Sequence, residues 1–146
     1  MTTLTLAQAN QILAAALAKS KQMGYKSMGV AVLDEAGHMK ACAREDGATM
    51  FRIDVATGKA WGAVAMGASS RTLMERAKDN PNFFTTLADT AKGKFLPQTG
   101  AVLIKDASGT VLGAAGASGG TGRRVCRVGQ LAAWVNLWLG STNDSA

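Results

Sequence analysis

The sequence MGVAVLDEAGHMKACAR, residues 28–44, carries the clearest structural pattern of the chain. Residues 28–33 form a short apolar run, as in strands that are covered on both faces. The residues DEAG at 34–37 are typical of a tight turn. Residues 39–44 alternate in side-chain polarity, which is typical of a strand. The stretch therefore predicts an antiparallel β-hairpin.

A second hairpin is expected at residues 101–105 and 110–117, around the turn DASG at 106–109. Helical patterns surround the two hairpins. Thr5 and Gln8 form a capping-box pattern that begins the first helix. Asn80 is the expected cap of a later helix, with Pro81 at its first position. The expected helices cover about 6–23, 53–65, 70–77, 81–92 and 122–139.

The resulting order is helix, hairpin, three helices, hairpin, helix. Because helices separate the hairpins, we expect an α+β fold with helices packed on an antiparallel sheet. We expect one domain over residues 1–140 and a polar tail over 141–146. Gly58 and Gly62 lie on one face of their helix, which predicts a close approach to a neighbouring element.

The composition excludes several classes of protein. The chain contains sixteen lysines and arginines and ten aspartates and glutamates, and its net charge of +6 suits an anionic partner. No basic run is interleaved with aromatic residues, so we expect no nucleic-acid partner. No apolar run reaches the roughly 18 residues of a membrane span, and the start lacks a signal-peptide pattern. We therefore expect no membrane contact and a cytoplasmic location, with Cys42 and Cys126 reduced.

The segment GAAGASGGTG, residues 113–122, leaves a strand and enters the last expected helix. Such a turn presents unpaired backbone N–H groups, to which the helix dipole adds positive potential. Arg123 and Arg124 follow where that dipole disfavours cations, so an external anion would remove the conflict. The alternative is a tight turn of small residues without a ligand. The predicted ligand-binding residues are Arg44, Ser118, Gly119, Gly120, Thr121, Arg123 and Arg124.

Two other features suggest functions. His38 is the only histidine and follows the turn at Gly37, so we expect it to be exposed at a hairpin end. It is a ligand for a metal ion or haem iron, an acid–base group, or a solvated turn residue. Trp134 and Trp138 are four residues apart on the last expected helix, which predicts a subunit contact, with a core position as the alternative.

The sequences DEAGH (34–38) and REDGA (44–48) resemble the Asp-x-x-Gly-His and Arg-x-Asp-Gly-Ala motifs of the GlcG/HbpS-like, haem-degrading domain family. Asp54 with Lys59 resembles its next helix, and Gly113 followed by SGGT (118–121) resembles its glycine-rich segment. The resemblance covers nearly the whole chain.

The resemblance implies a five-stranded, profilin-like antiparallel sheet flanked by helices, and a homo-oligomer. Members include haem-binding and haem-degrading proteins, a haem-binding domain joined to a cobalamin adenosyltransferase, and small proteins associated with glycolate or aromatic-acid catabolism. Many members carry acidic residues after the position of Thr121. This chain has GRRVCR at 122–127, which reverses the local charge.

Three hypotheses follow. The first is a haem- or tetrapyrrole-binding protein, with propionates near the glycine-rich turn and either His38 or Thr121 as the iron ligand. The second is a small enzyme of tautomerase, hydratase or deaminase type, acting on an unsaturated carboxylic acid in aromatic-compound catabolism. Its arginines would clamp carboxylates, and backbone N–H groups would stabilise an enolate. The third is an oligomeric accessory protein without catalysis. The candidate proton carriers of the enzyme are Asp34, Asp46, Asp54 and Lys59.

Overall fold

The computed structural model describes residues 3–119. Within them, four strands form one antiparallel sheet in the order β2-β1-β4-β3. The strands are β1 (Gly29–Asp34), β2 (Met39–Arg44), β3 (Ala101–Lys105) and β4 (Val111–Ser118). The helices are α1 (Leu6–Gln22), α2 (Phe51–Met66), α3 (Ser70–Asp79) and α4 (Pro81–Thr90).

The predicted α+β class and the order of these eight elements are confirmed. The described residues contain four strands, where the family resemblance implied five. The expected last helix, the tail and both candidate interface tryptophans lie outside the described residues. Within the described residues, no helix is long and apolar enough to cross a membrane.

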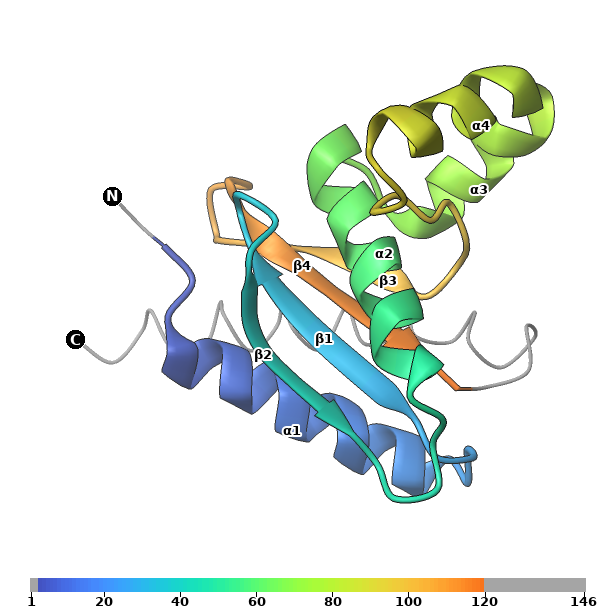
Figure 1. The fold of residues 1–146 in the computed structure, drawn as a ribbon. Helices are drawn as coiled ribbons and strands as arrows, with labels where there is room; N and C mark the ends of the chain where they lie inside the picture. Colours follow the sequence, from blue (N-terminus) through green and yellow to red (C-terminus); the bar gives the residue numbers. More distant parts are fainter. Residues whose placement is uncertain (1–2, 120–146) are drawn as a thin grey trace.

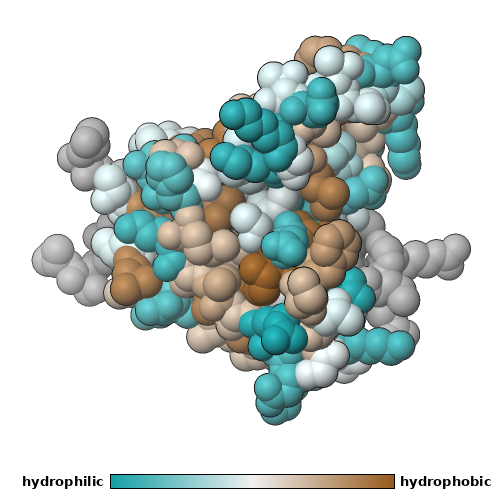
Figure 2. Space-filling model, viewed as in Figure 1, coloured by the Kyte–Doolittle hydropathy of each residue, from teal (hydrophilic) through white to brown (hydrophobic). Residues whose placement is uncertain are grey.

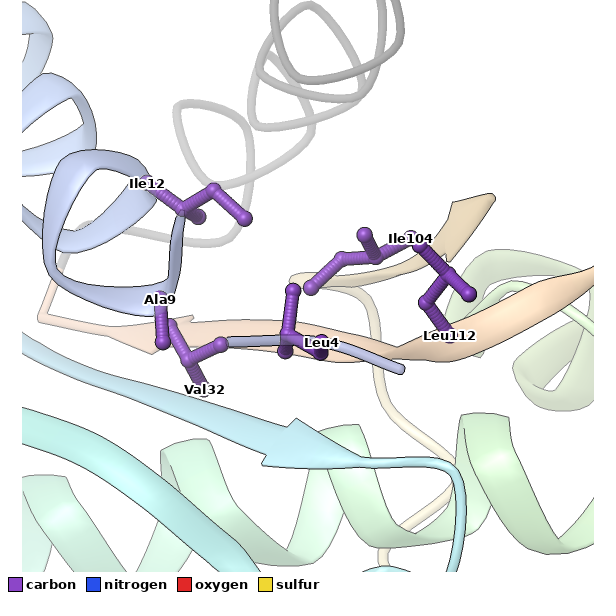
Figure 3. Close-up of a cluster of buried hydrophobic side chains, with 6 residues drawn as sticks. All are labelled: Leu4, Ala9, Ile12, Val32, Ile104 and Leu112. Carbon is purple, nitrogen blue, oxygen red and sulfur yellow. The ribbon is translucent and has the colours of Figure 1, made fainter. Parts of the chain in front are cut away.

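Helices α1 and α2 cover opposite faces of the sheet, while α3 and α4 project beyond it (Figure 1). Successive residues of β1 point to opposite faces. Val32 accordingly packs with Ile12 of α1, whereas the neighbouring Leu33 packs with Ala60 of α2. Figure 3 shows the first of these clusters, formed by Leu4, Ala9, Ile12, Val32, Ile104 and Leu112.

Local residues explain where α1, α3 and α4 begin. Thr5 and Gln8 form the predicted capping box at the start of α1, and the Ser69 side chain accepts a hydrogen bond from the Thr72 N–H at the start of α3. The expected cap at Asn80 is wrong in one respect, because its side chain makes no capping hydrogen bond. Helix α4 instead begins with Pro81, whose fixed φ suits that position.

Glycines let α2 lie unusually close to the sheet. A Cβ atom on Gly116 of β4 would stand 2.1 Å from the carbonyl oxygen of Ala56. On another side of α2, Cβ atoms on Gly58 and Gly62 would stand 3.1 Å from Leu96 and 3.0 Å from the Phe95 ring. The predicted close approach at these two helix glycines is therefore confirmed, and it fixes α2 between the sheet and the chain that follows α4.

Candidate functional site

Residues of three strands lie in one row at the edge of the sheet where β1 begins. Gly29 is the register partner of both Arg44, at the end of β2, and Ser118, at the end of β4. Directly paired residues in a sheet point to the same face. This face is the one covered by α2, because a Cβ atom on Gly29 would stand 2.9 Å from the Arg52 Cβ.

Helix α2 adds two cations to this row. The Arg52 Nη1 donates to the Ser118 Oγ over 3.5 Å. Two turns later, the Lys59 Nζ donates to the Ala117 carbonyl oxygen over 3.2 Å. Lys59 is only 6% exposed. Burial, and secondly the positive charge of Arg52, lower the pKa of Lys59 to about 8.

The loops at this edge are tied together by polar contacts. The Ser27 hydroxyl donates to the Asp46 carbonyl oxygen over 2.7 Å. The Met28 N–H donates to the Glu45 carboxylate over 2.8 Å, and the Arg44 guanidinium donates to the Ala48 carbonyl oxygen. The chain from β2 into α2 is thereby held against the start of β1.

An exposed apolar pair stands directly before the first of these cations. Met50 is 80% exposed and Phe51 is 65% exposed, the largest values among the exposed large hydrophobic residues in the described part of the chain. Figure 2 shows hydrophobic and hydrophilic residues intermixed over the middle of the viewed face. Met50 and Phe51 directly precede Arg52, so exposed apolar side chains and a cation lie at the same end of α2.

Gly119 has a structural reason to be glycine. Its φ of +146° is one that side chains rarely adopt. A Cβ atom would also stand 2.6 Å from the Ser27 carbonyl oxygen and 2.9 Å from the Met28 Cα. The protein backbone therefore fills the space next to this residue. Its predicted contact with an anion stays a prediction.

The structure gathers some of the predicted site residues and separates others. Arg44, Lys59, Ser118 and Gly119 share the edge described above, and the backbone of Asp46 lies beside it through Ser27. Gly120, Thr121, Arg123 and Arg124 lie outside the described residues.

Asp34 and His38 lie at the opposite end of β1, about 17 Å from Gly29 along an extended strand. The Asp34 carboxylate accepts hydrogen bonds from the N–H groups of Ala36 and His38, each at 2.9 Å. Asp106 binds two N–H groups in the same way in the other hairpin turn. Asp34 therefore holds its turn together, and His38 is exposed as predicted.

Asp54 is exposed on the side of α2 away from Arg52, because two residues correspond to roughly 200° around a helix. The four candidate proton carriers consequently do not converge. Among residues 3–119, no three histidine, cysteine or acidic side chains are grouped in a way that could hold a metal ion.

Arg52 is the site residue that sequence reasoning missed. A spacing of seven residues from Lys59, two helical turns, places both cations on one face of α2 and was the available signal. That signal is weak by itself, since most arginines at this spacing from a lysine lie on solvated helix faces.

Solved structures of similar fold cover nearly the whole chain. A double mutant of HbpS from Streptomyces reticuli is 28% identical, with a TM-score of 0.79 over 96% of this chain and 89% of that chain. The Klebsiella pneumoniae protein ORFY is 25% identical, with a TM-score of 0.79 over 90% of this chain and 89% of that chain. PduOC, solved as a haem complex, is 23% identical, with a TM-score of 0.79 over 92% of this chain and 95% of that chain. At this identity, the similarity shows the fold alone.

No curated protein matches the chain. The family model described as "Haem degrading protein HbpS-like" matches residues 4–128. This match covers most of the sequence and includes both hairpins and the edge that carries Arg44, Lys59 and Ser118. The chain therefore belongs to the HbpS-like family of haem-degrading proteins.

Proposed function

We propose that this protein binds haem or a related tetrapyrrole at the edge formed by Arg44, Arg52 and Ser118. The observation that carries the proposal is the exposed pair Met50 and Phe51 directly before the cations of α2. A tetrapyrrole is a flat apolar ring with carboxylate side chains, so it would bury the apolar pair and place its carboxylates on the cations. Membership of the HbpS-like family supports this choice of ligand.

The glycine-rich turn at residues 118–121 belongs to the same proposal. Ser118 and Gly119 stand at the end of β4 on this edge. Arg123 and Arg124 follow closely in the sequence and add two further cations for anionic groups. Because cations attract carboxylates over several ångströms, a carboxylate bound at this edge would be attracted by Arg44 and Arg52.

Hemin titration of the purified protein should give a saturable shift of the Soret band at micromolar concentration. Phe51→Ser is expected to weaken binding about tenfold or more, since burying a phenylalanine contributes about 1.5–3 kcal/mol. Phe83→Ser is the matched control, because Phe83 is also exposed, at 51%, but lies on α4. Equal hemin affinity in wild type and Phe51→Ser would remove this surface from the proposal.

The iron ligand is tested separately. His38 lies at the other end of β1 from Met50 and Phe51, so a haem on its imidazole would sit at the β1–β2 turn. His38→Ala is then expected to alter the haem spectrum while Phe51→Ser leaves it unchanged. If Phe51→Ser alters the haem spectrum and His38→Ala does not, the macrocycle lies on α2 and His38 is a turn residue.

The proposed assembly is a homo-oligomer that uses the expected last helix. Trp134 and Trp138 lie outside the described residues, and their spacing is the basis of this proposal. Trp138→Ala is expected to weaken association by about 2 kcal/mol, as buried aromatic anchors at interfaces do. Light scattering at micromolar concentration measures this effect, and a wild-type mass equal to one chain would contradict the assembly.

A further inference from the structure

Two cations of α2 contact neighbouring residues at the end of β4, Arg52 at the Ser118 hydroxyl and Lys59 at the Ala117 carbonyl oxygen. Ser118 is 2% exposed and Lys59 is 6% exposed. The Arg52 Nη1 lies 3.5 Å from the Ser118 Oγ, and the Lys59 Nζ bonds the neighbouring carbonyl oxygen of Ala117. A guanidinium, an ammonium and a hydroxyl group, all hydrogen-bond donors, therefore converge on one short segment of β4.

The positive charge of this cluster is not balanced by the described part of the chain. Within residues 3–119, neither Arg52 nor Lys59 forms an ion pair with a carboxylate. From Gly120 to the end, the sequence contains one acidic residue, Asp144, and three arginines. Buried lysines are almost always paired, because an isolated charge is costly to remove from water. Within residues 3–119, the cluster therefore has no anion beside it.

The fold keeps Arg52 at this position by omitting a side chain opposite it. Gly29 is the register partner of Ser118, and a Cβ atom on Gly29 would stand 2.9 Å from the Arg52 Cβ and 3.0 Å from its carbonyl carbon. The backbone of α2 consequently lies directly over the Gly29–Ser118 pair. A larger residue at position 29 would therefore displace Arg52 from the Ser118 hydroxyl group.

We propose that Arg52, Lys59 and Ser118 form a binding site for a compact oxyanion, a carboxylate or a phosphate group. The guanidinium can hold two oxygens of such a group at once, and the ammonium and hydroxyl groups can hold others. If the ligand is a tetrapyrrole, this site takes one of its carboxylates and to that extent rests on the proposed function. Small anions test the site without haem.

The experiment titrates haem-free protein with sodium acetate and with inorganic phosphate, against sodium chloride at matched ionic strength. Backbone amide shifts of Ser118 and Gly119 in NMR spectra report binding. We expect saturable shifts with acetate, phosphate or both. The anion that binds more tightly shows whether the site prefers a carboxylate or a phosphate group. Arg52→Gln is expected to weaken the tighter anion about tenfold or more, as for a charge-assisted hydrogen bond.

Arg76→Gln is the matched control, because it removes the same charge from an exposed position on α3. It should bind both anions as wild type does. The proposal is overturned if neither anion gives saturable shifts, if Arg52→Gln binds as wild type, or if both variants weaken binding equally. Anion binding without hemin binding would support this site and contradict the tetrapyrrole proposal.

Discussion

Gly116→Ala should lower the free energy of unfolding by about 3 kcal/mol, at the upper end of what overpacking a core costs. The added Cβ would stand 2.1 Å from the Ala56 carbonyl oxygen and 3.2 Å from the Ala60 Cβ. The first contact is with helix backbone, so no side-chain rotation can relieve it. Helix α2 would have to move away from β4, and the contacts of Arg52 and Lys59 with β4 would lengthen. Urea unfolding followed by circular dichroism measures the loss.

Gly109→Ala is the matched control for this substitution. Gly109 has a φ of +86° in the second hairpin turn, and a Cβ there would meet nothing within 4 Å. Only the backbone strain remains, which costs about 1–2 kcal/mol. A loss in Gly116→Ala no greater than that in Gly109→Ala would show that α2 and β4 are not in tight contact.

Lys59→Met should change how stability depends on pH. The pKa of Lys59 is lowered from 10.5 to about 8 in the folded protein, chiefly by burial and then by Arg52. Below about pH 8 the amine is protonated in both states, and folding pays the full cost of burying the charge. Between about 8 and 10.5 the unfolded chain binds more protons than the folded one, so this contribution makes stability rise with pH.

The expected difference between wild type and Lys59→Met is a slope of up to about 1.4 kcal/mol per pH unit within this window. Between about pH 8 and 10.5, the free energy of unfolding of wild type should therefore rise by about 3 kcal/mol relative to that of the variant. Loss of the bond to the Ala117 carbonyl shifts the Lys59→Met curve without changing the slope. Lys78→Met, at an exposed position on α3, is the control and should show no slope difference. Parallel curves for wild type and Lys59→Met would mean that Lys59 is solvated in the folded protein.

Local patterns were enough to predict the elements of the described chain. The alternation of residues 39–44, the aspartate-led turns and the Thr5 capping box depend on neighbours a few residues away, so the sequence contains the whole signal. The family resemblance likewise rests on short motifs that occur in this chain in the same order as in the family. The expected starts and ends of the eight described elements differ from the observed ones by no more than two residues, and the differences arise because helix ends also depend on tertiary contacts.

The candidate site was only partly predictable, because its members are far apart in the sequence. Arg52 and Ser118 are separated by 66 residues, and Lys59 and Ala117 by 58. Sequence reasoning placed Arg44 and Ser118 together as ligand-binding residues, but it assigned Lys59 to the candidate proton carriers with Asp34, which lies at the opposite end of β1. Residues at the two ends of one hairpin strand are close in sequence and distant in space.

The sequence by itself determined the α+β class, the order of the elements and the residues of the turns, since these follow from side-chain periodicity and local backbone preferences. Only the tertiary structure decided that Arg52 belongs to the site and that Lys59 is buried. Both facts depend on how closely α2 approaches the sheet, and Gly29 and Gly116 set that distance. Burial and unbalanced charge are properties of packing between distant segments, which no local pattern contains.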